Sequence, residues 1–255
     1  MVKMVAWGAA GLAGLLAGSF LNVAISRLPY GQSVVSPGSH CPRCKHRLGA
    51  MDLIPVLGYI LRGGRCHFCQ EPILSRYPLV EILTALGFIA VAEGSGLPSA
   101  LVNGWIFTAI LIAAAFTDLE TGLIPNRITY PGMIIGISLS AKTIGFGGSL
   151  TGSIFFAGLL WAAAVLSKGG MGGGDIKLAA VIGTFLGIEG SGITLLLASL
   201  AGSVKAIHLL LKGRCGRKTS LPFGPYLAGS AWLVWMWGDQ LLELYVAMIS
   251  FISRF

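Results

Sequence analysis

Charged side chains are scarce in this sequence, and acidic ones are the scarcest. Only 11% of the 255 residues are charged, with 10 acidic residues against 18 basic ones, whereas a soluble domain carries about 25% charged residues. Hydrophobic residues make up 55% of the chain, and its mean hydropathy is +0.80. This shortage of charge excludes an ordinary soluble domain and predicts an all-α polytopic membrane protein.

Apolar runs of about 20 residues are long enough to cross a bilayer as helices. The sequence contains about eight candidates, of which the sixth is short and the eighth is long. They cover residues 4–25, 78–94, 99–117, 128–145, 151–167, 177–189, 191–211 and 222–249. We therefore expect a first transmembrane helix at 1–25, a polar loop domain at 26–77 and a larger transmembrane domain at 78–255. In the first run Ala10, Gly14 and Gly18 lie four apart, a spacing that suits close helix packing in lipid.

Basic residues are rare outside one set of loops. Most of the 18 fall in the loop 26–77, near residues 127, 168 and 177, or between 205 and 218. Because Lys and Arg stay preferentially in cytoplasmic loops, this pattern predicts that those loops are cytoplasmic and that both termini are not. The net charge of +8 follows from this asymmetry and from contact with anionic membrane lipid, so it calls for no nucleic acid.

The long polar loop contains two CxxC pairs, formed by Cys41 and Cys44 and by Cys66 and Cys69. Each pair brings two sulfurs near one point, and two such pairs predict a tetrahedral four-thiolate zinc site. Two disulfides or a redox CxxC are the alternatives, and a reducing cytoplasm disfavours the disulfides. Four protein ligands leave no open coordination position, so we expect the zinc to be structural.

Two of the few acids stand where apolar runs end or begin. Asp118 follows one run in "AAAFTDLETGLIPN", and Asp175 lies between glycines and an apolar helix in "GMGGGDIKL". Taken singly, Asp175 could be a helix N-cap and Asp118 a solvated helix end. Taken together, they are predicted at one membrane depth, where two carboxylates sharing a site would provide the acid and the base of an aspartyl peptidase.

The glycines before Asp175 fit the same interpretation. Gly172, Gly173 and Gly174 have no Cβ, so a substrate backbone could lie against this loop. With "TDLETGLIPN", the paired CxxC loop, "GSFLNVAISRLP", "RYPLVE" and "LPFGPYLAG", the segment "GMGGGDIKL" closely resembles the type IV prepilin peptidases nearly end to end. In one place the chain departs from the family's usual pattern, because Leu53 stands where Asn is common.

The resemblance implies an intramembrane aspartyl peptidase of the bacterial inner membrane, with its active site at the cytoplasmic face. It would remove the short basic leader of type IV prepilins or of type II secretion pseudopilins. The family's catalytic aspartates map onto Asp118 and Asp175, and its four cysteines onto the pairs above. Members with the cysteine loop typically also N-methylate the new terminal residue, using S-adenosylmethionine. No G-x-G-x-x-G follows a strand in this sequence, so the methyl-donor site rests on the resemblance alone.

A basic leader needs acids to receive it, and the cytoplasmic surface predicted here is itself basic. Glu81, inside the second predicted span, and Glu120, beside Asp118, are candidate substrate-binding residues. Two other classes of protein stay open. A small proton-coupled transporter would place carboxylates in the membrane but would also show inverted repeats, which the sequence lacks. A zinc-binding membrane scaffold without catalysis would not depend on either aspartate.

Overall fold

The computed structural model describes residues 2–95, 98–140, 142–167, 170–212 and 222–252. Within these ranges the regular structure is helical, without strands, as the composition predicted. Lys168, Cys215 and the basic residues between 213 and 221 lie outside the described residues. The helices are α1 (Val2–Arg27), α2 (Leu57–Leu61), α3 (Arg76–Gly94), α4 (Pro98–Thr121), α5 (Asn126–Ser140), α6 (Gly145–Leu166), α7 (Gly173–Leu211) and α8 (Gly224–Ile252), with short 3-10 turns at Leu28–Tyr30 and Met51–Leu53.

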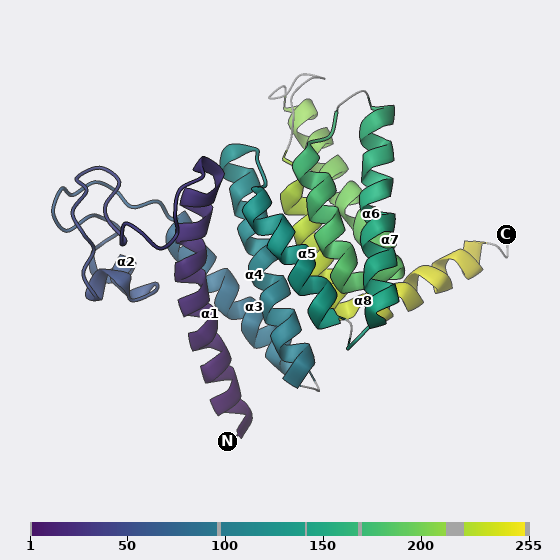
Figure 1. Cartoon of the computed structure of the whole chain (residues 1–255), viewed down its shortest axis with the longest axis horizontal. Coiled ribbons are helices and arrows are strands. Elements are labelled where there is room, and N and C mark those ends of the chain that lie inside the picture. The colour runs from purple at the N-terminus through teal and green to yellow at the C-terminus, as the bar shows by residue number, and fades with distance from the viewer. Residues whose placement is uncertain (1, 96–97, 141, 168–169, 213–221, 253–255) are drawn as a thin grey trace. The chain divides into compact units, whose positions relative to one another are not determined.

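The chain divides into two compact units, residues 1–113 and 114–255, and the division falls inside α4. In the first unit α1 and α3 lie side by side (Figure 1). A Cβ on Gly14 would come within 2.6 Å of the Ala85 Cα, and one on Gly18 within 2.6 Å of the Glu81 Cα. The four-residue spacing of small side chains in α1 therefore does bring two helix backbones together, as predicted.

Other contacts of the first unit join its helices through polar and aromatic side chains. The Asn22 side-chain amide of α1 donates to the Tyr77 carbonyl at 2.9 Å. Farther along, the Trp105 indole donates to the Phe88 carbonyl at 2.9 Å and stacks on the Phe88 ring. Between α1 and α3 the chain forms the cysteine-containing loop that includes α2 (Figure 1).

In the second unit α7 is broken at Gly187, whose φ of 67° and ψ of −166° are not helical. Gly187 packs near α6, because a Cβ on Gly152 would lie 2.6 Å from the Gly187 Cα. The Ser149 hydroxyl of α6 also donates to the Thr184 carbonyl at 2.7 Å. The glycines on this face let the two helices touch through their backbones.

The first arm of α7, residues 173–186, runs in the same direction as α8. Its Asp175 and the first residue of α8, Gly224, both interact with Asp118. Ten residues on, Phe185 meets Trp235 of α8 edge to face, with ring centroids 6.4 Å apart. The contacts therefore advance along both helices together.

The second arm of α7, residues 188–211, runs the opposite way. A Cβ on Gly190 would lie 3.4 Å from Val234, and one on Gly202 would lie 3.6 Å from Phe223. As α7 advances, its contacts move back toward the start of α8. The helix is thus a hairpin of two arms, at the place where the sequence predicted two separate runs at 177–189 and 191–211.

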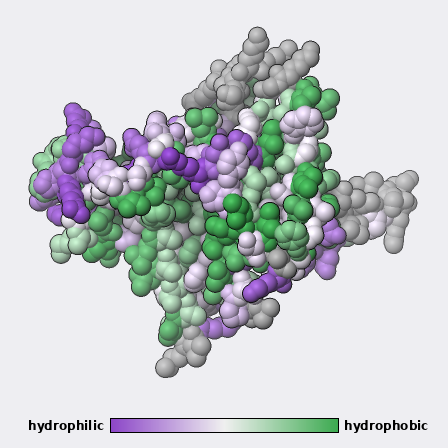
Figure 2. All heavy atoms as spheres, viewed as in Figure 1, coloured by the Kyte–Doolittle hydropathy of each residue, from purple (hydrophilic) through white to green (hydrophobic). Residues whose placement is uncertain are grey.

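Among the described residues, five helical segments are long and apolar enough to cross a membrane, with the arms of α7 taken together. They are Lys3–Tyr30, Arg76–Gly94, Pro98–Thr121, Gly145–Leu166 and Gly173–Leu211. Large apolar side chains are exposed on them, such as Leu16 at 58% and Ile154 at 65%. In Figure 2 hydrophobic residues cover much of the helices, while hydrophilic residues gather over the loop that holds α2. Exposed apolar faces of this kind suit contact with lipid.

Candidate functional site

Asp118 and Asp175 lie in the same unit, at helix ends that the fold brings together. Asp118 is in the last turn of α4 and is 7% exposed, and Asp175 is in the first turn of α7 and is 9% exposed. Their charges interact, so the two carboxyl groups share one electrostatic environment. The fold thus brings two aspartates from distant parts of the chain into one neighbourhood, and their action as a catalytic pair stays a prediction.

Asp118 is held by backbone groups on both sides. Gly122, with a φ of +65°, ends α4 and donates its N–H to the Asp118 carbonyl at 2.9 Å, in the manner of a glycine helix terminus. The Gly224 N–H at the start of α8 donates to Asp118 Oδ2 at 2.9 Å. A Cβ on Gly224 would lie 2.7 Å from that oxygen, so only glycine permits this approach.

Asp175 is not the N-cap of its helix. Gly172 occupies the cap position with extended backbone, and no side chain caps the helix. The Asp175 N–H donates to the Gly172 carbonyl at 3.1 Å, while its side chain turns inward. Among the described residues Asp175 Oδ1 is buried and has no hydrogen-bond partner. A buried carboxylate oxygen without a partner is costly, and a role as a mere cap does not explain it.

The glycines before Asp175 have different surroundings. A Cβ on Gly174 would lie 3.1 Å from Ile124, so this glycine packs against the turn that follows α4. Gly173 is exposed and has open space around it, and a Cβ on Gly172 would lie 3.5 Å from Asp175 Oδ2. The run therefore combines one tightly packed position with two that leave room beside the carboxylate.

A polar contact fixes the start of α7 against α5. Lys177 Nζ donates to Asn126 Oδ1 at 2.8 Å and lies 5.6 Å from the centre of the Tyr130 ring. Glu120 lies two residues beyond Asp118 and is exposed. The start of α7, which carries Asp175, is thus held against α5, and the exposed acid Glu120 lies near Asp118 in the sequence.

The four predicted cysteine ligands form one cluster in the first unit. Their Sγ atoms all lie within 4.8 Å of one another, with Cys41 and Cys69 3.8 Å apart and Cys44 and Cys66 4.0 Å apart. All four are free thiols, so the disulfide alternative is wrong. Four sulfurs at 2.3 Å from a tetrahedral zinc would be about 3.8 Å apart. The cluster therefore has the spacing and the donor atoms that zinc requires.

The two cysteine turns have the same backbone design. In each turn, the backbone carbonyl of the first cysteine accepts a hydrogen bond from the N–H of a residue with positive φ. That residue is Lys45 in one turn and Gln70 in the other. Arg43 of the first turn donates to Glu71 of the second at 2.6 Å. The N–H groups of Cys69 and Phe68 hold the pKa of the Cys66 thiol down at about 7, while burial and the neighbouring thiols hold the pKa of Cys69 up at about 11. Cys66 is thus the thiol most ready to act as the thiolate that a metal needs.

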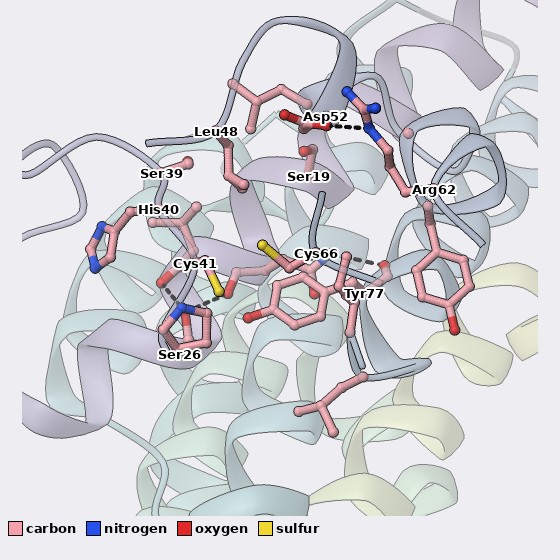
Figure 3. A pocket seen from close by; sticks show the side chains of 18 of the residues that line it. Ser19, Ser26, Ser39, His40, Cys41, Leu48, Asp52, Arg62, Cys66 and Tyr77 are labelled. Atoms are coloured by element: carbon pink, nitrogen blue, oxygen red, sulfur yellow. Dashed lines mark hydrogen bonds and ion pairs between the residues drawn. The ribbon is translucent and has the colours of Figure 1, made fainter. Parts of the chain in front are cut away.

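A cavity of about 390 Å³ lies between this loop and the ends of α1 and α3 (Figure 3). Glu81, a predicted substrate-binding acid, lines it and is only 8% exposed. Its Oε2 accepts the Val56 N–H at 2.7 Å. Leu53 lines the same cavity, as does Asp52, which is paired with Arg62 at 2.7 Å. Glu81 and Glu120 thus belong to different units.

Sequence reasoning missed three participants. The Gly224 N–H lies in "LPFGPYLAG", a segment that entered the sequence analysis only as part of the family resemblance. The Lys177–Asn126 contact and the Val56–Glu81 bond join residues far apart in the chain. The one local clue to the role of Gly224 was its place between Pro222 and Pro225, since a glycine in an irregular segment often permits a close approach of the backbone.

Comparisons with known proteins agree on one family. Residues 12–93 match the bacterial Peptidase A24 N-terminal domain, and residues 105–207 match the type IV leader peptidase family. The chain is 36% identical to the prepilin leader peptidase/N-methyltransferase of Aeromonas hydrophila, covering 91% of each protein. It is 35% identical to the protein of that name from Bacillus subtilis, over 92% of this chain and 96% of the relative. For the one from Pseudomonas aeruginosa the identity is 33%, over 94% and 93%. No solved structure matches the chain.

Proposed function

The chain belongs to the type IV leader peptidase family, and on that premise we propose that it cleaves prepilin leaders with Asp118 and Asp175 as its catalytic pair. The observation that carries this proposal is the burial of both carboxylates in the same unit, where Asp175 Oδ1 has no hydrogen-bond partner among the described residues. Buried, interacting acids are expensive to maintain, and they are typical of hydrolytic sites.

The two aspartates have unequal surroundings, which suggests a division of roles. Asp118 accepts an N–H bond from Gly224, and such a bond favours the charged carboxylate. Asp118 is therefore assigned the role of the general base, which takes a proton from the attacking water. Asp175 Oδ1 has no donor within the described part of the chain. Asp175 is therefore assigned the shared proton, which it delivers to the scissile peptide as the amide nitrogen leaves.

The arrangement in the membrane is a further part of this proposal. We propose eight crossings, made by α1, α3, α4, α5, α6, the two arms of α7, and α8. The distribution of basic residues then puts the cysteine loop and both aspartates at the cytoplasmic face of the bacterial inner membrane, with both termini on the other side. The peptidase part would comprise residues 78–255, with the first crossing at 1–25 and the zinc domain at 26–77.

The cysteine cluster is proposed to hold one structural zinc. Cys41, Cys44, Cys66 and Cys69 would supply four thiolates, and the ion would join the two turns of the loop. For the second activity named in the relatives, the methyl donor is S-adenosylmethionine, whose sulfonium supplies an activated methyl group. The acceptor is the amine that leader cleavage exposes.

Substrate recognition is assigned to the open side of the aspartate pair. The exposed Gly173 and Gly172 leave room for the backbone of a prepilin or pseudopilin. Glu120 is exposed two residues from Asp118, so it can meet the basic residues of the leader. Membrane lipid surrounds the exposed apolar faces of the helices.

The catalytic assignment is tested by Asp118→Asn and Asp175→Asn in the purified full chain, with cleavage of a prepilin followed by mass spectrometry. Asn keeps the shape of the side chain but cannot carry the proton, so each variant should lose at least about 10³-fold in cleavage rate. Asp239→Asn, at an exposed aspartate of α8, is the matched control and should cleave normally. Cleavage by either site variant within tenfold of the unmodified protein would contradict the assignment.

The role of Glu120 is tested by charge reversal. Glu120→Lys should raise KM more for a leader rich in Lys and Arg than for a neutralised leader. Glu189→Lys, at the exposed turn between the arms of α7, is the control for a general change of surface charge. Equal effects on the two leaders would show that Glu120 is only a solvated residue.

A further inference from the structure

The first turn of α7 needs a support that its own sequence does not supply. It begins within the glycine run 172–174, and glycine leaves the backbone free to adopt many conformations. No side chain caps the helix at Gly172. Asp175 nevertheless turns inward from this first turn and is only 9% exposed. A contact from elsewhere in the fold must therefore fix the turn.

Two contacts reach this turn from the segment that follows α4. A Cβ on Gly174 would lie 3.1 Å from the Ile124 Cβ, and Lys177 Nζ donates to Asn126 Oδ1 at 2.8 Å. Residues three apart lie on one face of a helix, so Gly174 and Lys177 present one face of α7 to this segment. In Figure 1 the helix that begins at Asn126, α5, runs beside α7.

The Lys177 ammonium is committed to this contact. A lysine at the end of a membrane span ordinarily extends its charge toward water and the lipid headgroups. This side chain instead lies along α5, where its Nζ is also 5.6 Å from the centre of the Tyr130 ring, within the range of a cation–π interaction. No ion pair among the described residues includes Lys177. Both of its partners are neutral, so the contact brings no further acid to the aspartates.

The helix face that Lys177 holds determines where Asp175 points. The two residues are two positions apart, so their side chains leave α7 about 160° apart around its axis. Side chains end about 5–6 Å from a helix axis, so rotating the turn by about 10° would move the Asp175 carboxylate by about 1 Å. A misplacement of that size can slow an enzyme by about 10²-fold.

The segment on the other side of the contact continues from Asp118. Asn126 comes eight positions after Asp118 in the chain. Between them the backbone turns at Gly122, whose N–H donates to the Asp118 carbonyl at 2.9 Å. The bond between Lys177 and Asn126 therefore joins the helix that carries one aspartate to the segment that follows the other.

We propose that Lys177 is a positioning residue of the peptidase site, which acts through Asn126 to fix the Asp175 carboxylate relative to Asp118. In this role Lys177 touches neither the substrate nor the reacting atoms. The proposal rests on the proposed function, because it concerns the alignment of that catalytic pair. Loss of the bond should leave substrate binding intact and slow the chemical step, since proton transfer depends on the placement of both carboxylates.

The test is the steady-state cleavage of a prepilin by the purified full chain in detergent, followed by mass spectrometry. Lys177→Met keeps the apolar stem but removes the donor, so kcat should fall by about 10²-fold while KM stays within about twofold. Asn126→Leu removes the acceptor and should have the same effect, and it decides the question if Lys177→Met fails to fold. Lys205→Met, at an exposed lysine of the same helix, is the matched control and should cleave normally.

The two partners also permit a rescue experiment. Asn126→Lys combined with Lys177→Asn re-forms the bond in the opposite direction, so its kcat should exceed that of either single substitution by at least about tenfold. A lysine that contacted the substrate could not be replaced from α5 in this way. Lys177→Met combined with Asn126→Leu should be no slower than either change alone, because both remove the same bond.

Three outcomes would overturn the proposal. One is a kcat within about threefold of the unmodified protein in both Lys177→Met and Asn126→Leu. Another is a raised KM at unchanged kcat, which would assign Lys177 to substrate binding. The third is a loss of activity that parallels a lower melting temperature, which would make the bond merely structural. Cleavage by Asp118→Asn or Asp175→Asn would instead contradict the proposed function, so the two failures are distinguishable.

Discussion

The two units hold their functional groups in different ways. In the second unit the aspartates are positioned by helix backbones that touch through glycine, as at Gly224 against Asp118 and Gly174 against Ile124. In the first unit the cysteine cluster and the cavity are built from an irregular loop. That loop is joined to the helices by isolated hydrogen bonds, such as the one that the Val56 N–H donates to the Glu81 carboxylate. The aspartates of the second unit are thus held by close backbone packing, whereas the loop of the first unit is organised by a four-cysteine cluster and a few polar contacts.

This difference predicts how each unit fails. Backbone packing responds to the addition of a single methyl group, because the neighbouring backbone cannot move aside. A loop organised by four thiolates responds instead to the loss of one ligand, since metal binding contributes folding free energy directly. Changes in one unit should therefore leave the other unit's structure intact.

The largest effect is expected from Cys66→Ser. The variant should lose its zinc, and amide exchange between residues 39 and 74 should accelerate by several orders of magnitude because the ion stabilises the loop. Exchange in α6 and α7 should stay unchanged. Metal analysis and hydrogen-exchange mass spectrometry measure both, with Arg47→Ser as the control. Full zinc content in Cys66→Ser would break the comparison.

A smaller effect is expected from Gly224→Ala. The new Cβ would lie 2.7 Å from Asp118 Oδ2, so the N–H bond to the carboxylate must lengthen and prepilin cleavage should fall by about 10²-fold. Gly229→Ala changes the same helix where a Cβ meets open space, and it should cleave normally. Equal activities for the two variants would remove the role given to Gly224. Zinc content should be normal in both.

The smallest effect concerns the ion pair between Asp52 and Arg62. Hydrogen bonding by Arg62 holds the pKa of Asp52 below its usual value. The pair therefore stabilises the loop above the unfolded pKa of about 3.9, and it stops doing so as pH falls through the lower folded value. Asp52→Asn should lower the free energy of unfolding of the loop by about 0.5–1 kcal/mol at pH 7.

Thermal melts of both proteins at several pH values measure this difference. It should be constant from pH 8 to pH 5 and should shrink progressively as the pH falls below about 3.9. Any loss of metal in acid affects both proteins, so the comparison at each pH cancels that effect. A difference that did not shrink in acid would show that Asp52 acts through its shape and not through its charge.

The parts of this fold that depend on local pattern were predictable from the sequence. Hydrophobic run length indicated the helices, the spacing of Gly14 and Gly18 indicated a close helix contact, and the CxxC pairs indicated a cluster of four sulfurs. Contacts made by backbone groups were not predictable, because the Gly224 N–H and the Val56 N–H carry no residue-specific pattern. The inward turn of Asp175 was also hidden, since an acid at the start of a helix is equally compatible with a cap.

The break at Gly187 has a consequence for the bilayer itself. At a rise of 1.5 Å per residue the first arm of α7, residues 173–186, is only about 21 Å long, whereas the hydrocarbon core is about 30 Å thick. In the proposed topology this arm crosses the membrane by itself, so the lipid beside it must thin, or water must descend to the level of its first turn. Asp175 lies in that turn. In that arrangement a short helix would bring the solvent that the proposed hydrolysis consumes to a carboxylate that is otherwise buried.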